Sequence, residues 1–177
     1  MRLVLIVLLM VLVAALAFHQ LYSYDVFTHL AAGRLIFERH AVPRTDPFSE
    51  TLAGAPWVDH EWLFQVVLYP LFRTGGVRAL TLFRILLVVG VFAVVLAAIE
   101  SRRSHLAAVL LVTAAAMSSY ARFQMRPELG SFLFLAVTLV VLVRAQRRPD
   151  TRWLFALPVI QLVWVNVHGL FILGPLV

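Results

Sequence analysis

Apolar residues follow one another in long runs along this chain instead of recurring at the spacing of an amphipathic helix. The runs cover residues 2–21, 77–99, 105–121, 129–143 and 153–177. A helix needs about 20 apolar residues to cross the roughly 30 Å hydrocarbon core of a bilayer. The pattern predicts an all-α polytopic transmembrane helix bundle of about five spans, in which residues 1–177 form a single transmembrane domain.

The first run has a second interpretation, because a secretory signal peptide also begins with a positive charge and an apolar stretch. Ala15, Leu16 and Ala17 resemble the small-residue cleavage site of such a peptide. The run is as long as the upper limit for that region, and further spans follow it. We therefore interpret it as an uncleaved first helix.

Residues 22–76 break the apolar pattern and predict a large loop that carries two surface helices. The first helix is expected over about Asp25 to Arg39, and the second over Glu61 to Phe72. The second is apolar, but its 12 residues would extend only about 18 Å as a helix. It is too short to span a bilayer, so we expect it on or in the membrane surface, with Gly75 and Gly76 ending it.

Composition supports a membrane protein and excludes an ordinary soluble domain. Hydrophobic residues make up 62% of the 177 residues and charged residues 14%, against roughly 45–50% and about 25% in soluble domains. The absence of Cys excludes a disulfide framework and a thiolate metal site.

All 15 basic residues are Arg, and the net charge is +6. A high pI can indicate nucleic acid as a partner, but these Arg residues lie mostly at the ends of apolar runs, where they orient a membrane protein. The Arg-rich stretches 101–104 and 144–152 predict cytoplasmic loops. The N-terminus is then cytoplasmic as well, and the loop 22–76 lies on the outer face. We expect membrane lipids, and no nucleic acid, as partners.

Polar residues differ between the two predicted sides. The cytoplasmic side carries almost only Arg, whereas the outer side carries acids, imidazoles, guanidiniums and an amide: Asp25, His29, Glu38, His40, Asp46, Asp59, His60, Glu61, Arg122, Arg126, Glu128, Asn166 and His168. Loops are polar by default, so plain solvation is the alternative to a functional site. The chemical variety on one side favours a site.

Asp25 is the sharpest candidate for chemistry. An acid at the outer end of a helix could act as a general base toward an acceptor hydroxyl or amide, or it could simply cap the helix that follows. His29 lies one turn later on the same face, where it could orient Asp25 or join a metal site. One His and one Asp are too few for a metal, and the sequence does not show whether Asp46, Asp59, His60 or Glu61 converge on them. A divalent metal ion stays open as a cofactor.

Two further groups are candidates for binding. Arg126, together with Arg122, offers a planar fork suited to phosphate, although an interfacial Arg can also reach lipid headgroups. Asn166 and His168 interrupt an apolar run, and polar residues at membrane depth tend to face a bundle interior or a water-filled cavity. Hydrogen bonding between helices is the alternative for this second pair.

Several stretches resemble the amino-terminal part of the polytopic GT-C glycosyltransferases. That group includes the oligosaccharyltransferase catalytic subunits and the protein mannosyltransferase and lipid A aminoarabinose transferase relatives. The stretches are "AAGRLI" (31–36), "HAVPRTDPFS" (40–49), "GAPWVDHEWL" (54–63), "RPELGSFLF" (126–134) and "WVNVHGLFILGP" (164–175). In layout, the likeness covers almost the whole chain.

The resemblance implies that a sugar passes from a polyprenyl-phosphate-linked donor to an acceptor on the outer face of a bacterial inner membrane. It implies that the catalytic acid is Asp25 and that the donor phosphate binds Arg122 and Arg126. The supporting residues are His29, Asp46, Glu61, Asn166 and His168. The chain departs from the family in having Asp25-Val26 where many relatives have paired acids, and in having fewer spans than the family core.

Two other function classes remain. A membrane transporter or channel subunit would use Asn166 and His168 to line a path, and a non-catalytic membrane scaffold would need none of the polar residues for more than folding.

The chain ends on the apolar stretch "GLFILGPLV" without a polar tail. We therefore expect a C-terminally truncated chain that is the N-terminal portion of a larger transporter or enzyme and is not active alone.

Overall fold

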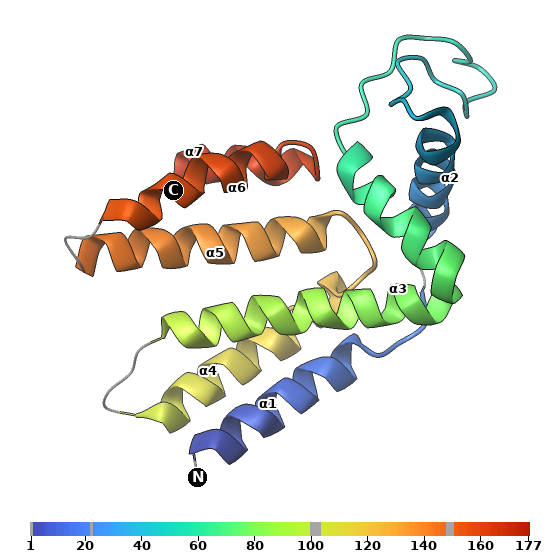
Figure 1. Cartoon of the computed structure of the whole chain (residues 1–177). Helices are drawn as coiled ribbons and strands as arrows, with labels where there is room; N and C mark the ends of the chain where they lie inside the picture. Colours follow the sequence, from blue (N-terminus) through green and yellow to red (C-terminus); the bar gives the residue numbers. More distant parts are fainter. Residues whose placement is uncertain (1, 22, 100–103, 148–150) are drawn as a thin grey trace.

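The computed structural model describes residues 2–21, 23–99, 104–147 and 151–177. The described chain is helical and contains no strand, with only an isolated bridge between Thr45 and Pro56. Its α-helices are α1 (Arg2–Ala17), α2 (Asp25–Arg39), α3 (Trp62–Ala98), α4 (His105–Ser118), α5 (Glu128–Arg147), α6 (Ala156–Trp164) and α7 (Leu173–Leu176) (Figure 1). Short 3₁₀ turns cover Tyr120–Arg122, Thr151–Phe155 and Gly169–Ile172. The all-α prediction is confirmed.

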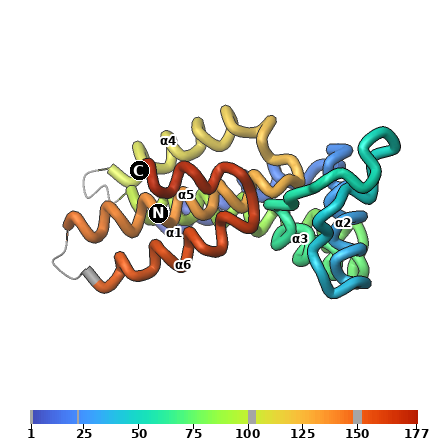
Figure 2. The backbone as a smooth tube through the Cα atoms, turned by 90° about the horizontal axis from the view of Figure 1, so that it is seen from above, coloured from blue at the N-terminus to red at the C-terminus, as the bar shows by residue number. Residues whose placement is uncertain are grey.

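The helices form a layered bundle with a smaller unit at one end. Helices α1, α4 and α5 lie beside the second part of α3, and α6 packs on the other side of α5 (Figures 1 and 2). Helix α2 packs against the first part of α3. One buried cluster joins α1, α3 and α4 through Val13, Val88 and Val112. A second cluster joins α2 and α3 through Val26 and Leu68, and holds the end unit on the bundle.

Helix α3 is bent at Gly76, whose φ of 59° and ψ of −149° lie outside the helical region. Glycine adopts such a positive φ without the steric cost that a Cβ imposes. The bend separates an arm that packs against α2 from a longer arm inside the bundle (Figure 1). The bend falls at the glycines that were predicted to end the surface helix. The second arm follows the first without an intervening loop, so the two arms are described together as α3.

Two of the described helices, Trp62–Ala98 and Glu128–Arg147, are long and apolar enough to cross a membrane. The other predicted spans correspond to shorter apolar helices, Arg2–Ala17, His105–Ser118 and Arg152–Trp164. The prediction of about five spans is therefore not confirmed. The Arg-rich stretches 101–104 and 144–152, predicted to be cytoplasmic, lie partly outside the described residues.

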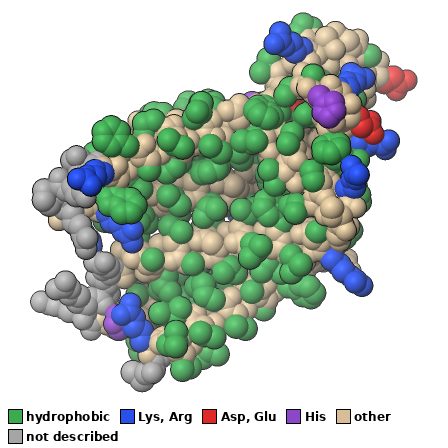
Figure 3. Space-filling model, viewed as in Figure 1, with side chains coloured by type: hydrophobic (Ala, Val, Ile, Leu, Met, Phe, Trp, Pro, Cys, Tyr) green, Lys and Arg blue, Asp and Glu red, His purple; other side chains and the backbone are tan. Residues whose placement is uncertain are grey.

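Apolar side chains cover the visible face of the bundle, while charged side chains gather toward its ends (Figure 3). The exposed apolar residues include Leu8, Leu86, Leu110, Leu111 and Val159. Large exposed apolar patches mark surfaces that contact a membrane or another protein. This surface is consistent with a membrane protein, as are the two long apolar helices.

Arg84 in α3 holds the end of α1 in place. Its side chain is completely buried, and its guanidinium donates hydrogen bonds to the backbone carbonyls of His19 and Gln20. Backbone groups just beyond a helix C-terminus need such partners when they are buried. The His19 imidazole also lies 3.1 Å from the carbonyl oxygen of Phe123, through Nε2. These bonds fix the chain just before α2 beside the segment that leads into α5.

Gly33 lets α2 approach α3 closely. A Cβ at this position would overlap the backbone carbonyl of Gln65. One turn earlier on each helix lie His29 and Glu61, so the close approach brings these two side chains together. The glycine in the stretch "AAGRLI" thus positions a pair of candidate site residues.

Candidate functional site

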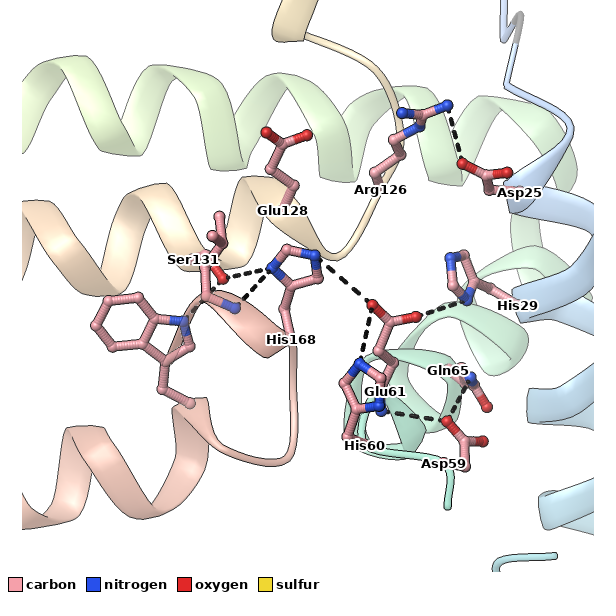
Figure 4. A network of polar contacts seen from close by, with 12 residues as sticks. Asp25, His29, Asp59, His60, Glu61, Gln65, Arg126, Glu128, Ser131 and His168 are labelled. Atoms are coloured by element: carbon pink, nitrogen blue, oxygen red, sulfur yellow. Dashed lines mark hydrogen bonds and ion pairs between the residues drawn. The ribbon is translucent and has the colours of Figure 1, made fainter. Parts of the chain in front are cut away.

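A polar pocket of about 350 Å³ lies where the end unit meets the bundle. It is lined by Asp25, Thr28, His29, Glu61, Arg126, Pro127, Glu128 and His168. Its volume is within the roughly 300–1,000 Å³ of ligand pockets. Four separate parts of the sequence contribute to this pocket, and Figure 4 shows most of these side chains converging.

Three helices begin at this pocket, and each start carries an acid. Asp25 is the first residue of α2, Glu61 precedes α3, and Glu128 is the first residue of α5. The N-terminus of a helix carries a partial positive charge, which stabilises acids and other anions placed there. These helix starts therefore favour the charged forms of the acids that they carry, although burial acts against the charge of Glu61.

Asp25 forms an ion pair with Arg126, with 2.9 Å between Oδ2 and Nη2. The Nε–H of Arg126 donates a hydrogen bond to the hydroxyl of Ser23 at 3.1 Å. The structure assigns the capping position of α2 to Tyr24, and the Asp25 carboxylate instead engages Arg126. Both partners are about half exposed, at 52% for Asp25 and 43% for Arg126. Such an exposed pair contributes about 0–1 kcal/mol, so a bound anion can displace it.

Glu61 lies among three histidines (Figure 4). Its Oε2 is 3.8 Å from Nδ1 of His29, and its Oε1 is 3.7 Å from Nε2 of His168 and 3.9 Å from Nε2 of His60. These distances exceed those of hydrogen bonds. Burial raises the pKa of Glu61, His60 opposes the rise, and Asp59 and Asp25 add to it.

His29 is the most buried histidine of the pocket, with 8% of its surface exposed. Burial lowers its pKa to about 4; Asp25 opposes this shift, and His168 and Arg126 add to it. Its Nδ1 is buried and has no hydrogen-bond partner in the described part of the chain. The ring meets Phe64 edge-on, with 5.9 Å between the centroids. His29 is therefore a neutral imidazole with an unused polar atom facing Glu61.

We expect acidification to destabilise the protein through His29. An unfolded chain takes up the proton near pH 6.5, whereas the folded His29 has a pKa of about 4. The unfolded state binds more protons in this interval, so stability is lost as the pH falls through it. The loss from this group is at most ~3 kcal/mol.

Thermal unfolding in detergent, followed from about pH 7 down to pH 4, measures this loss. The midpoint of the wild-type protein is expected to fall more steeply than that of His29→Gln, which lacks the titrating group. Parallel curves for the two proteins would contradict the prediction.

His168 is held by two buried residues that sequence reasoning missed. Its Nδ1 accepts the backbone N–H of Leu170 at 3.4 Å and lies 3.1 Å from the hydroxyl of Ser131. The indole N–H of Trp164 donates to the same hydroxyl at 2.8 Å. Ser131 could have been found from the sequence, because it interrupts an apolar run just as His168 does. Trp164 could not, because a Trp in an apolar helix is ordinary.

Asn166 joins the loop after α6 to the start of α3 and does not line the pocket. Its side-chain oxygen accepts from the indole N–H of Trp62 at 2.9 Å, and its side-chain nitrogen donates to the Leu162 carbonyl at 2.8 Å. Its own carbonyl accepts from the backbone N–H of Leu63 at 3.0 Å. These bonds bring Glu61 and His168 to the same place.

Asp46 lies apart from the pocket, in the long linker of the first loop. Its carboxylate accepts from the backbone N–H of Phe48 at 2.8 Å and from the hydroxyl of Ser49 at 2.5 Å. These bonds, with the Ser49 hydroxyl foremost, lower the pKa of Asp46. The carboxylate stabilises a turn, and the structure does not bring it to the other predicted site residues.

The described residues contain no group of three or more histidines and acids arranged to hold a metal ion. Asp59 is occupied in orienting the start of α3, because it accepts from the Glu61 backbone at 3.2 Å and from the Gln65 amide at 3.0 Å. Since Nδ1 of His168 accepts a backbone N–H, the proton of the neutral ring is on Nε2. That nitrogen faces Glu61 as a donor, whereas a metal ligand needs a free lone pair.

An apolar groove of about 280 Å³ runs between α3 and α5. It is lined by Val88, Val91, Phe92, Val95, Ser119, Arg122, Phe123, Leu129, Phe132, Leu135, Ala136 and Leu139. Arg122 lies 3.4 Å from Glu128, the first residue of α5, so its guanidinium is at the end of the groove that adjoins the polar pocket. The groove was not predicted from the sequence.

Comparisons of the chain with protein-family models, with curated proteins and with solved structures found no match. The geometry of the pocket and the groove is therefore the basis for assigning a function.

Proposed function

We propose that this protein is a membrane glycosyltransferase of the GT-C type. It transfers a sugar from a polyprenyl-phosphate-linked donor to an acceptor on the outer face of a bacterial inner membrane. In this proposal the N-terminus is cytoplasmic, and the five spans are supplied by α1, the long arm of α3, α4, α5 and the last apolar run, residues 153–177. The observation that carries the proposal is the Asp25–Arg126 ion pair, which joins residues 101 positions apart in the sequence at the wall of one polar pocket.

The phosphate of the donor binds Arg126. The guanidinium offers a planar set of N–H donors that match phosphate oxygens. The polyprenyl chain lies in the apolar groove, with Arg122 at the end nearest the pocket. A lipid phosphate is a ligand whose apolar and anionic parts match two adjoining surfaces of this kind.

Binding of the phosphate also prepares Asp25 for catalysis. When the phosphate takes the place of Asp25 on Arg126, the carboxylate is released into the pocket. The acceptor hydroxyl then forms a bond to the anomeric carbon of the sugar and transfers its proton to Asp25. The bond from that carbon to the phosphate oxygen breaks, and the polyprenyl phosphate leaves with the electron pair. Asp25 is the general base in this scheme.

Binding of a polyprenyl phosphate to the protein in detergent tests the proposal. The variant Arg126→Gln is expected to bind this lipid about tenfold more weakly than the wild type, because it loses hydrogen bonds between charged groups. Asp25→Asn is expected to bind at least as tightly as the wild type, since the competing carboxylate is neutralised.

The matched control for this measurement is Arg34→Gln. Arg34 also forms an exposed ion pair, with Glu38 at 2.8 Å, but lies outside the pocket. Equal weakening by Arg126→Gln and Arg34→Gln would show only an effect of net charge and would overturn the phosphate assignment.

A further inference from the structure

Glu61 lies in the same pocket as the Asp25–Arg126 pair but takes no part in the reaction described above. Figure 4 shows its carboxylate between His168 and His29, away from the ion pair. Each of its two oxygens faces an imidazole at a distance longer than a hydrogen bond, 3.8 Å to His29 and 3.7 Å to His168. The carboxylate therefore has unused capacity to accept hydrogen bonds.

The imidazoles around Glu61 have unused capacity as well. The buried Nδ1 of His29 has no hydrogen-bond partner in the described part of the chain. In native proteins, more than about nine in ten buried polar groups have a partner. This nitrogen faces the Glu61 carboxylate, 3.8 Å away, and a ligand hydroxyl that bridges the two groups would supply the missing bond.

The proton on His168 is placed by the residues behind it. Leu170 donates its backbone N–H to Nδ1, so this nitrogen carries no proton and Nε2 carries it. The hydroxyl of Ser131 receives the indole N–H of Trp164, and its own proton is then free to be donated to the same Nδ1. His168 thus presents an N–H donor next to the Glu61 acceptor.

The Glu61 acceptor lies 3.7 Å from the N–H donor of His168 and 3.8 Å from Nδ1 of His29. Polar groups this close together fit a ligand with neighbouring hydroxyl groups. A hydroxyl donates one hydrogen bond and accepts others, so it can bond to a carboxylate and an imidazole N–H together. An anion is disfavoured beside Glu61 and already has a place at Arg126. The side chains on this side of the pocket are therefore complementary to a polyol.

We propose that Glu61, with His29 and His168, binds neighbouring hydroxyls of the sugar that is transferred, and that Ser131 is a positioning residue for His168. This inference rests on the proposed function, because a donor phosphate on Arg126 is what brings its sugar into the pocket. It gives Glu61 a role in recognising the sugar, separate from the role of Asp25 as base.

The test compares two lipids, a bare polyprenyl phosphate and the same lipid carrying one hexose, for binding to the protein in detergent. Glu61→Gln is expected to weaken binding of the glycosylated lipid about tenfold and to leave binding of the bare lipid unchanged. Glu38→Gln makes the same chemical change outside the pocket and is expected to affect neither lipid.

The outcomes separate this inference from the proposed function. Equal affinities of wild type and Glu61→Gln for the glycosylated lipid, or equal weakening for both lipids, would overturn the assignment of Glu61 while leaving the phosphate site intact. Failure of the wild-type protein to bind either lipid would overturn the proposed function and this inference with it.

A spectroscopic measurement tests Ser131 without any ligand. The ¹⁵N chemical shifts of the His168 ring are expected to show protonated Nε2 in the wild type. In Ser131→Ala the share of the Nδ1-protonated tautomer is expected to rise, because only the longer bond from Leu170 then holds Nδ1 as an acceptor. The variant is also expected to bind the glycosylated lipid about threefold more weakly, as befits loss of one hydrogen bond of ordinary strength. An unchanged tautomer population would overturn the positioning role.

Discussion

Asp25→Asn is expected to slow sugar transfer by about 10²–10⁴-fold, the contribution that a positioned general base makes. The asparagine keeps the size of the side chain but cannot accept the proton of the acceptor hydroxyl. Binding of the lipid phosphate is expected to persist, because Arg126 provides it and loses only a competing partner. The measurement is the rate of sugar transfer in membranes that contain the protein.

Glu50→Gln is the control for this loss. Glu50 is an exposed acid of the linker between α2 and α3, outside the pocket, and its substitution is expected to leave the rate unchanged. A transfer rate that survived Asp25→Asn would show that Asp25 is not the base. If variants of Asn166 or His168 then abolished flux of a solute across the membrane, the transporter interpretation would replace the transferase.

Arg84→Leu is expected to lower the free energy of unfolding by ~1–3 kcal/mol, the cost of leaving a buried polar group without a partner. The substitution removes the guanidinium that donates to the part-buried carbonyl of His19. The bond to the Gln20 carbonyl counts less, because Gln20 is exposed to solvent. The leucine has no group that can replace the guanidinium. Thermal or denaturant unfolding in detergent measures the loss.

Arg78→Leu provides the comparison, because Arg78 is exposed on the same arm of α3. Its effect is expected to stay within about ±0.5 kcal/mol, as for most surface substitutions. Since Arg84 anchors the chain just before α2, Arg84→Leu is also expected to weaken binding of the polyprenyl phosphate. Equal stability of the two variants would mean that other donors satisfy the end of α1.

Helical structure could be predicted from the sequence because apolar runs of this length leave the backbone few other ways to satisfy its hydrogen bonds in an apolar environment. The bend at Gly76 was predictable for a similarly local reason, since two successive glycines mark a place where a helix readily ends. Span lengths were less predictable. Helix α4 ends at Ser118, before the predicted end at residue 121, because the chain changes to a 3₁₀ turn over Tyr120–Arg122.

The candidate site was predicted only as a set of residue types. Asp25 and His29 are one turn apart on one helix, and this local relation follows from the sequence. The contact of Asp25 with Arg126 does not, because it depends on how α1 ends and how the chain enters α5. Contacts between distant segments cannot be read from the sequence. For this reason Asp46 was grouped with the site, and Ser131 and Trp164 were overlooked.

The sequence by itself determined that the chain is helical and apolar, that a helix is interrupted at Gly75 and Gly76, and that Asp25 and Glu61 lie at the starts of helices. These properties depend on hydropathy and on residues that are close together in the sequence. Only the tertiary structure decided that Asp25 meets Arg126, that Glu61 lies between His29 and His168, and that Asn166 joins two segments instead of lining the pocket. Those contacts depend on helix packing at Gly33 and on the anchoring of α1 by Arg84, which no stretch of sequence shows alone.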